Sequence, residues 1–576
     1  MRRIVLLIIV LFISNEMVYG QKIAFEQDPE RNVTSTYEEL IDFYKKIARR
    51  DGRAKLMEVG QTDVGKPLHL LVLSADRDFD PKDIKAKGKA VMLINNGIHP
   101  GEPEGIDASM MFVRDLLLGN KLPADVVICV VPVYNVSGML DRGTSRANQN
   151  GPVSYGFRGS RQHYDLNRDF IKSDTRNAKL FQHVFHTWDP DIFFDTHTSN
   201  GADYQYVMTL IATHPDKLSS PLSDFMQEKF TAPLYKRMEK SGIPMIPYVN
   251  TKEETPESGL VAFLETPRYS TGYAALHHTI GYMPETHMWK PYEQRVKAMY
   301  VLLNHLLAIT AEEHKALVQI RRLTREAAQK QEIFPLSWKL DTDSVDTLSF
   351  LGYRAGRKAS NISGAQRLFY DRQKPTAIQI PYYHHYKPDV RVKKPVAYVI
   401  PQAYDDVIAL LRLNGVQMRA LERDTVLEVE TYYIEAYQTS RQPYEGHYLH
   451  DNVRTRSVVG GMAFYAGDWI VETDQQAVRY IIETLEPAAT DSFFNWNFFD
   501  AILSQKEYFA PYIFEEEAER LLKEHPGWRD ELEHEKQRDE QLRQNGRLQL
   551  DWIYKKSAYY EKGHLRYPVA RLLKSP

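Results

Sequence analysis

Short, fully apolar segments that alternate with amphipathic segments dominate the chain between residues 91 and 194. The apolar segments cover residues 91–94, 126–133 and 192–194, and segments with helical spacing cover 104–118 and 177–188. Strands without a polar face are buried on both sides, so helices must cover both faces of the sheet that they form. The sequence therefore predicts an α/β fold, in which loops at the strand ends carry the functional side chains.

The chain is long enough for several domains. At about 150 residues per domain, its 576 residues suggest two to four. A helical segment at 36–49 leads into the α/β pattern, which continues to about residue 330. Short alternating runs beyond residue 335 predict short strands, and residues 511–554 form a highly charged helical stretch. We therefore divide the chain into an α/β domain, residues 21–330, and an α+β region, residues 331–576.

The first twenty residues have the layout of a secretory signal peptide. Arg2 and Arg3 precede an apolar run at residues 4–13, and Gly20 ends the polar stretch that follows. The run is ten residues long, whereas a membrane span needs about 20; an uncleaved anchor is the alternative. We expect residues 1–20 to be removed, the protein to be exported to the periplasm or the extracellular space, and the mature chain to lack a membrane span.

The charge and the cysteine content argue against nucleic-acid binding and against a cysteine-ligated metal site. The net charge is −3 with both signs interspersed, so we expect no nucleic-acid partner. Cys129 is the only cysteine and lies in an apolar run, where we expect it to be buried. A disulfide within the chain and a cysteine-ligated metal site are both excluded, so any metal must be bound by His and carboxylate side chains.

Two histidines and a glutamate lie at the ends of predicted strands. His99 and Glu102 follow the apolar segment 91–94, and His197 follows the segment 192–194. Neighbouring strand ends can bring such side chains together. Two His and one Glu around an open fourth position are a recurrent catalytic zinc arrangement, which activates water and polarises a carbonyl. Each histidine alone would be explained more readily as a hydrogen-bonded turn residue.

A third motif, Asp-Leu-Asn-Arg-Asp-Phe at residues 165–170, lies between the other two. The order His-x-x-Glu, Asp-Leu-Asn-Arg-x-Phe, then His at a strand end resembles the zinc metallocarboxypeptidases related to carboxypeptidases A and B. The resemblance covers about residues 35–330. It implies a doubly wound catalytic domain with a mixed sheet and one Zn²⁺ per chain, bound by His99, Glu102 and His197. The rest of the chain resembles the additional C-terminal region of large bacterial members.

The resemblance implies a site for the C-terminal carboxylate of a substrate. An Asn-Arg pair binds this group in the family, which assigns the role to Asn167 and Arg168. The chemistry agrees, because a guanidinium fork matches a carboxylate in a bidentate pair. Asp165 matches the family's carboxylate that orients the first zinc histidine, here His99. The alternative for Asn167 and Arg168 is a surface loop with a local salt bridge.

The resemblance also implies an arginine that polarises the scissile carbonyl and stabilises the oxyanion. In the regulatory branch of the family this arginine lies nine residues before the Asn, and Arg158 stands nine residues before Asn167. We therefore assign Arg158. Arg146 is its main competitor, and Arg142 and Arg161 are further alternatives.

The resemblance further implies that the general base is a Glu on a later strand. Family members of the bacterial type resemble Pro-Glu-Thr-His-Met-Trp-Lys-Pro-Tyr at residues 284–292, which assigns the base to Glu285. It would accept a proton from the attacking water and pass it to the leaving amine, a role that suits a carboxylate whose pKa is raised by burial. Glu265 is the alternative. The family's mobile tyrosine corresponds to Tyr269 or Tyr273, between which the sequence does not decide.

The implied activity is that of a zinc metallocarboxypeptidase, a hydrolase that removes C-terminal residues from a peptide with a free C-terminus. One alternative is a zinc amidase or deacylase that acts on N-acyl amino acids or cell-wall peptides. Another is a non-catalytic binding protein, against which the intact ligands and the candidate base argue. The physiological substrate, the side-chain preference, the role of the C-terminal region and the oligomeric state are not indicated.

The adjacent histidines His384 and His385 raise the question of a second metal site. They lie in the run Tyr-Tyr-His-His-Tyr, which reads as a strand. Adjacent residues of a strand point to opposite faces. We therefore do not expect these two histidines to share a metal.

Overall fold

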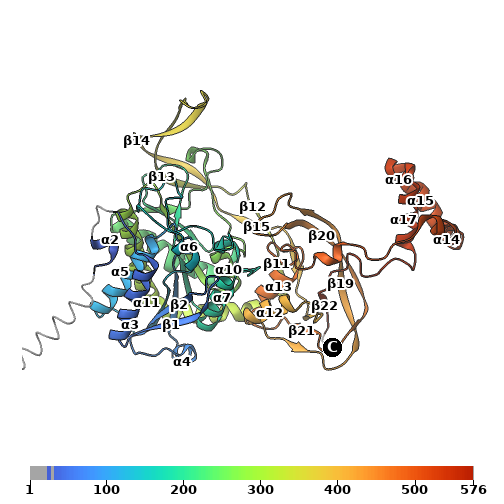
Figure 1. Ribbon diagram of the computed structural model, residues 1–576, viewed down its shortest axis with the longest axis horizontal. Coiled ribbons are helices and arrows are strands. Elements are labelled where there is room, and N and C mark those ends of the chain that lie inside the picture. The colour runs from blue at the N-terminus through green and yellow to red at the C-terminus, as the bar shows by residue number, and fades with distance from the viewer. Residues whose placement is uncertain (1–21, 28–31, 575–576) are drawn as a thin grey trace, which may run out of the picture.

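The computed structural model describes residues 22–27 and 32–574. The predicted signal peptide, residues 1–20, lies outside the described residues. Figure 1 shows an α/β part that contains the N-terminal half of the chain, a β-rich part beside it, and a small group of helices at the far end. Within the described residues, no helix combines the length and apolar character that crossing a bilayer requires.

A mixed sheet of nine strands forms the centre of the α/β part. Its order is β1-β2-β4-β3-β5-β10-β7-β8, and β6 pairs with β10. The pairs β3–β4, β3–β5 and β5–β10 are parallel. The pairs β1–β2, β2–β4 and β7–β10 are antiparallel. The strands are β1 (Ala54–Gln61), β2 (Pro67–Leu73), β3 (Ala90–Asn95), β4 (Val126–Val131), β5 (Ile192–Asp195), β6 (His197–Ser199), β7 (Met208–Ala212), β8 (Met245–Pro247) and β10 (Ile280–His287).

Helices cover both faces of this sheet, as the apolar strands predict. One face carries α3 (Tyr37–Arg50), α5 (Glu104–Leu118) and α11 (Tyr292–Lys330), and the other carries α7 (Arg176–Trp188) and α10 (Ser270–Leu276). Alternate residues of β3 enter the two cores, with Met92 in the first and Leu93 in the second. Cys129 of β4 is buried in the second core. The predicted mixed-sheet α/β fold is therefore confirmed.

The region after residue 330 differs from the predicted series of short strands. Strands β13 (Asp346–Ala359) and β14 (Gln366–Tyr383) pair antiparallel in one long ribbon, which projects at the top of Figure 1. The ribbon also pairs with the short strand β9 (Leu260–Val261). Pro375 lies next to the register shift of the ribbon, and a bulge accommodates a proline within a strand. The proline therefore does not end the strand, although the sequence pattern suggests that it does.

A second sheet, of six strands, follows in the order β18-β21-β17-β22-β19-β20. Its strands are β17 (Ala397–Ile400), β18 (Arg419–Ala420), β19 (Thr425–Thr439), β20 (His450–Phe464), β21 (Trp469–Glu472) and β22 (Ala570–Leu572). Helices α12 (Asp405–Leu413) and α13 (Val478–Leu485) accompany it. Residues of α12 and α13 share one apolar cluster with α7 and α10 of the first part. The two sides of residue 330 are thus packed together through a common core, and the division at this residue stays a prediction.

The highly charged stretch near the C-terminus is helical, as predicted. It comprises α14 (Pro511–Glu524), α15 (Pro526–Arg538), α16 (Glu540–Gln544) and α17 (Gly546–Lys556). These helices enclose a small apolar cluster of their own. Figure 1 shows them at the end of an extended segment, away from the two sheets.

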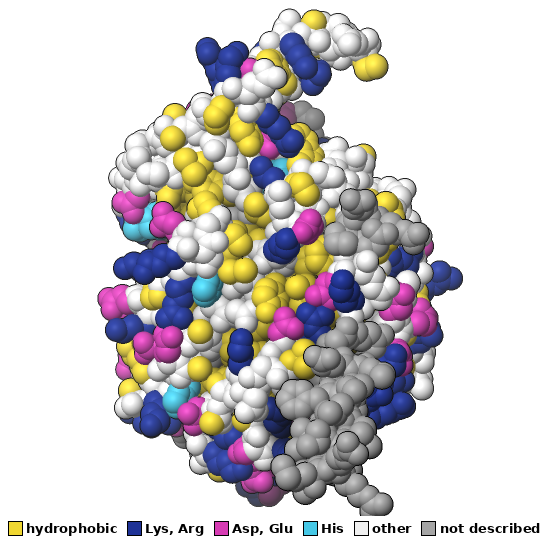
Figure 2. Space-filling model, turned by 90° about the vertical axis from the view of Figure 1, so that its left-hand side faces the viewer, with side chains coloured by type: hydrophobic (Ala, Val, Ile, Leu, Met, Phe, Trp, Pro, Cys, Tyr) yellow, Lys and Arg dark blue, Asp and Glu magenta, His cyan; other side chains and the backbone are white. Residues whose placement is uncertain are grey.

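The face of the α/β part in Figure 2 carries positive and negative side chains side by side, with apolar side chains between them. No single sign dominates this face. This distribution agrees with the small net charge of −3.

Candidate active site

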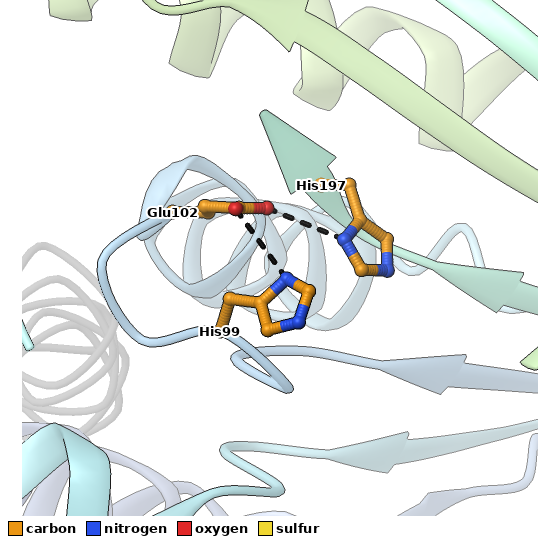
Figure 3. Close-up of side chains that lie close together, drawn as sticks. All are labelled: His99, Glu102 and His197. Atoms are coloured by element: carbon orange, nitrogen blue, oxygen red, sulfur yellow. Dashed lines mark ion pairs between the residues drawn. The ribbon is translucent and has the colours of Figure 1, made fainter. Parts of the chain in front are cut away.

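His99, Glu102 and His197 converge at one edge of the first sheet. His99 lies in the turn after β3, Glu102 lies just before α5, and His197 begins β6. Because β3 and β5 are parallel neighbours, the segments that follow them meet. The carboxylate of Glu102 lies between the two rings, with Oε1 3.4 Å from Nδ1 of His99 and Oε2 3.3 Å from Nδ1 of His197 (Figure 3). The three ligand atoms all lie within 4.8 Å of one another.

The outer nitrogens of both rings are held by carboxylates. Nε2 of His99 donates to Oδ1 of Asp165 at 2.8 Å, and Nε2 of His197 donates to Oδ2 of Asp195 at 2.9 Å. An imidazole that donates from Nε2 keeps the Nδ1 lone pair for a metal. Nδ1 of His99 is buried and has no hydrogen-bond partner among the described residues. Two imidazole nitrogens and one carboxylate, all buried, fit a single zinc ion.

Strong mutual electrostatics link these ligands. Burial alone would raise the pKa of Glu102, but the charges of His99 and Arg146 outweigh burial and hold this pKa well below its usual value. Burial would lower the pKa of His197, but the Asp195 carboxylate raises it well above its usual value. A metal binds the neutral imidazole, so protons and a metal ion compete for His197.

Asp165 connects the metal ligands to the Asp-Leu-Asn-Arg motif. It caps the short helix η2 (Leu166–Arg168), and its Oδ1 accepts hydrogen bonds from His99 and from the backbone N–H of Asn167, the latter at 2.9 Å. Its Oδ2 accepts from Nε and Nη2 of Arg158 at 3.1 and 2.8 Å. Burial opposes ionisation of Asp165, but the charges of His99 and Arg158 hold its pKa well below the usual range.

Asn167 and Arg168 therefore lie beside the metal ligands, although neither touches them. The buried Oδ1 of Asn167 accepts a hydrogen bond from the backbone N–H of Ser270 at 3.0 Å. Nη1 of Arg168 donates to the backbone carbonyl of Asn167 at 2.8 Å, and Nε donates to the hydroxyl of Tyr444 at 2.9 Å. The guanidinium also lies 4.4 Å from the centre of the Tyr269 ring. Tyr444 is a residue of the C-terminal region that sequence reasoning missed.

Two of the four candidate arginines reach the metal ligands. Nη1 of Arg158 lies 3.3 Å from Oε1 of Glu102, and Nη1 of Arg146 lies 3.2 Å from the same oxygen. Arg146 also donates to two backbone carbonyls, whereas 46% of the Arg158 side chain is exposed. Arg142 is bonded to three backbone carbonyls instead. Arg158 is therefore the freer of the two to face a substrate, and its role stays a prediction.

The charge of His197 acts on both candidate bases. Glu285 of β10 is in register with His197 of β6, and burial raises the pKa of Glu285 to about 8 against the opposing charge of His197. Burial likewise raises the pKa of Glu265 to about 8 against the charge of Lys217. Glu265 is only 2% exposed, and neither of its carboxylate oxygens has a hydrogen-bond partner among the described residues. Glu285 is partly exposed, so it is the better placed of the two to reach a substrate.

The structure distinguishes the two candidate tyrosines. Tyr273 is fully buried, and its hydroxyl donates to Oδ1 of Asn414 at 2.6 Å, so it belongs to the core. Tyr269 is partly exposed and lies against Arg168. Of the pair, Tyr269 is therefore the residue next to the predicted carboxylate site.

The charges of two site residues act on a third tyrosine, Tyr248. It follows β8, and burial together with the negative charges of Glu285 and Glu102 raises the pKa of its hydroxyl. It is one of 35 tyrosines and lies in no motif, so nothing in the sequence distinguishes it.

His384 and His385 contradict the expectation that their rings point apart. β14 ends at Tyr383, so both histidines lie beyond the regular strand, and their ring centres are 4.1 Å apart. Nε2 of His384 lies 2.6 Å and Nε2 of His385 3.6 Å from Oδ2 of Asp346. These three groups have the spacing of a metal cluster, but they are partly or fully exposed. The prediction is wrong in its premise, because the alternation of side chains holds only within the strand.

Comparison with known proteins identifies the α/β part. Residues 40–275 match the family model described as zinc carboxypeptidase. The chain is 21% identical over 478 residues to carboxypeptidase 2 of Trichophyton rubrum, which covers 79% of this chain and 82% of that protein. It is similarly 21% identical over 476 residues to carboxypeptidase 2 of Trichophyton equinum, with the same coverage.

A solved structure is also similar. The metallo-carboxypeptidase of Pseudomonas aeruginosa has a TM-score of 0.36 and 13% identity, and the match covers 49% of this chain and 70% of that chain. The family match falls on the segment that carries His99, Glu102 and His197, whose buried donor set fits one metal ion. The chain therefore contains a catalytic domain of the zinc carboxypeptidase family, and it is a zinc-dependent peptidase.

Proposed function

We propose that this peptidase is an exopeptidase that recognises the free C-terminal carboxylate of its substrate through Asn167 and Arg168. The observation that carries this proposal is the link from Arg168 through the η2 turn to Asp165, which bonds His99. A cationic fork is thereby held beside the zinc ligands, where it would bring the last peptide bond of a substrate to the metal.

The same residues suggest how hydrolysis proceeds. His99, Glu102 and His197 would hold the zinc ion, which when bound acts as a Lewis acid on the scissile carbonyl and activates water. Glu285 would accept the proton of the attacking water and then give it to the leaving amine. The guanidinium of Arg158 would stabilise the oxyanion that the carbonyl oxygen becomes when water adds to the carbonyl carbon.

Two carboxylates that bond the histidines support their role as metal ligands. Asp165 would orient His99, and Asp195 would orient His197, so each imidazole presents Nδ1 to the ion. Tyr269 would border the carboxylate site through its contact with Arg168. Glu265 has no contact of this kind, and we assign it no catalytic step.

A matched pair of peptides tests the exopeptidase role. One N-blocked peptide would be offered with a free C-terminus and with an amidated C-terminus. We expect the wild type to cleave the free acid at least tenfold faster in kcat/KM, because one charge-assisted bidentate pair is lost with the amide. Replacement of Arg168 by Ala should remove this difference. Equal turnover of both peptides by the wild type would contradict the role of Asn167 and Arg168.

We also propose that the protein is exported and that its peptidase domain ends near residue 330. The charged start and short apolar run of residues 1–20 support a cleaved signal peptide and a periplasmic or extracellular location. N-terminal sequencing of the mature protein after cell fractionation tests this. A mature chain that still begins at Met1 would contradict it.

A further inference from the structure

The loop between β19 and β20, residues 440–449, reaches the peptidase domain. The hydroxyl of Tyr444 accepts a hydrogen bond from Nε of Arg168 at 2.9 Å. Oε2 of Glu445 accepts a hydrogen bond from the backbone N–H of Asp165 at 2.8 Å. The C-terminal region thus contacts both ends of the Asp-Leu-Asn-Arg motif, from a point about 280 residues further along the chain.

The tip of this loop has an unusual backbone. The N–H groups of Tyr444 and His447 donate to each other's carbonyls at 2.7 and 3.1 Å, which closes a two-residue turn. Its central residues have positive φ values, +50° at Glu445 and +81° at Gly446. Such turns favour Asn, Asp or Gly at the first central position, and a longer side chain there is strained. The bond from Asp165 gives a reason for a glutamate at this position.

The turn is also fitted closely to the peptidase domain. A Cβ atom added to Gly446 would lie 2.8 Å from the hydroxyl of Tyr164, so a side chain has no room there. Nε2 of His447 lies 2.9 Å from Oδ2 of Asp174. Tyr444, Glu445 and His447 therefore have polar partners in the peptidase domain, and Gly446 between them lies against Tyr164.

The contact with Tyr444 leaves the end of the Arg168 guanidinium accessible. Nε is bonded to Tyr444, and Nη1 donates once, to the backbone of Asn167. Nη2 has no hydrogen bond among the described residues, and the Arg168 side chain is 20% exposed. A guanidinium fixed at Nε and stacked on Tyr269 holds its fork in one plane, which favours bidentate binding of a carboxylate.

We propose that the 440–449 loop completes the carboxylate site, with Tyr444 as the positioning residue for Arg168 and Glu445 as the positioning residue for the Asp165–Arg168 turn. Recognition of the substrate's C-terminus then depends on the region beyond residue 330. This inference rests on the proposed carboxylate role of Arg168.

Removal of one hydroxyl tests the role of Tyr444. In the full-length zinc enzyme, Tyr444→Phe should raise KM for the free-acid peptide about tenfold, with kcat within about twofold of the wild type, because a bond to a charged group is lost. Tyr448→Phe changes another tyrosine of the same loop, one that is 50% exposed, and should leave both constants unchanged. A Tyr444→Phe enzyme with the wild-type KM would overturn the role.

Variants at Glu445 show whether this residue positions the Asp165–Arg168 turn or only stabilises the fold. Glu445→Gly removes the carboxylate but relieves the positive φ, so the melting temperature should stay equal or rise while KM rises. Glu445→Gln keeps an acceptor oxygen and should restore most of the wild-type KM. If the melting temperature falls and KM is unchanged in Glu445→Gly, the residue is only structural and the inference fails.

The free-acid and amide pair of peptides distinguishes this inference from the proposed function. If the wild type cleaves both equally, the carboxylate role of Arg168 fails and the inference fails with it. If the wild type prefers the free acid and Tyr444→Phe shows the same preference and KM, the inference alone is overturned. A weakened preference in Tyr444→Phe but not in Tyr448→Phe supports it.

Discussion

At the scale of single residues, two carboxyl groups compete for the role of general base. Burial raises the pKa of both Glu285 and Glu265 to about 8, so acidity alone does not separate them. Position does, because Glu285 is partly exposed and in register with His197, whereas Glu265 is 2% exposed. A zinc ion held by His197 would favour the ionised form of its neighbour Glu285 and ready it to accept a proton.

Glutamine substitutions test this assignment. Glu285→Gln should lower kcat by about 10²–10⁴-fold, because a general base contributes this much. Its zinc content, measured by atomic emission, should equal that of the wild type, since Glu285 is not a ligand. Glu265→Gln is the matched control and should keep most of the activity. A large loss of kcat in Glu265→Gln with activity retained in Glu285→Gln would reverse the assignment.

Glu265 should instead affect stability. Its pKa rises from 4.5 in the unfolded chain to about 8 in the fold, so the folded state holds a proton that the unfolded state loses. Stability from this group is therefore full below pH 4.5 and is lost as pH rises toward 8, at about 1.4 kcal/mol per pH unit. Glu265→Gln should abolish this part of the slope when urea unfolding is measured at pH 5 and pH 8. Parallel stability curves for the two proteins would contradict the prediction.

At the scale of elements, the site lies at the ends of the strands. The sequence indicates β3, β4 and β5 because each is a short run of apolar residues. It indicates His99 and His197 because they follow two of these strands. The parallel register of β3 and β5 then brings the two histidines together. The pairing of strands themselves is not visible in a single sequence, and so the ribbon of β13 and β14 was expected as short strands.

The junction of β5 and β6 makes a prediction about metal affinity. Asp195 ends β5 and bonds the imidazole of His197, which begins β6. Asp195→Asn should weaken zinc binding by about 10–100-fold. The carboxylate of Asp195 orients the imidazole of His197 and raises the basicity of that ring, and both effects are lost in the variant. Competition with a chromogenic chelator measures this. Asp371→Asn, in the distant β14 ribbon, is the control, and equal zinc affinities in both variants would contradict the role of Asp195.

At the scale of the whole molecule, the peptidase domain and the C-terminal region share structure that the sequence does not reveal. One apolar cluster contains Phe185 and Tyr273 of the first region and Ile408 and Tyr480 of the second. The contacts of Tyr444 and Glu445 add polar links between the same regions. Contacts between residues hundreds of positions apart leave no local pattern, so the sequence predicts a boundary near residue 330 but not the packing across it.

Truncation and excision should therefore have opposite outcomes. A chain that ends at residue 330 exposes the shared apolar cluster and should be insoluble or lose cooperative unfolding. The charged helices α14–α17 have a separate apolar cluster, and the backbone N–H of Leu565 donates to the carbonyl of Ile502 at 2.9 Å. The two ends of this segment thus lie together, and a short glycine linker can replace residues 504–563.

The excised protein should keep the melting temperature within a few degrees and the wild-type kcat/KM, because β22 can still enter the second sheet between β17 and β19. Calorimetry and the free-acid peptide measure the two quantities. A soluble, fully active chain that ends at residue 330 would contradict the dependence of the carboxylate site on the C-terminal region. Loss of folding after excision would show that α14–α17 stabilise the two sheets, which their separate core argues against.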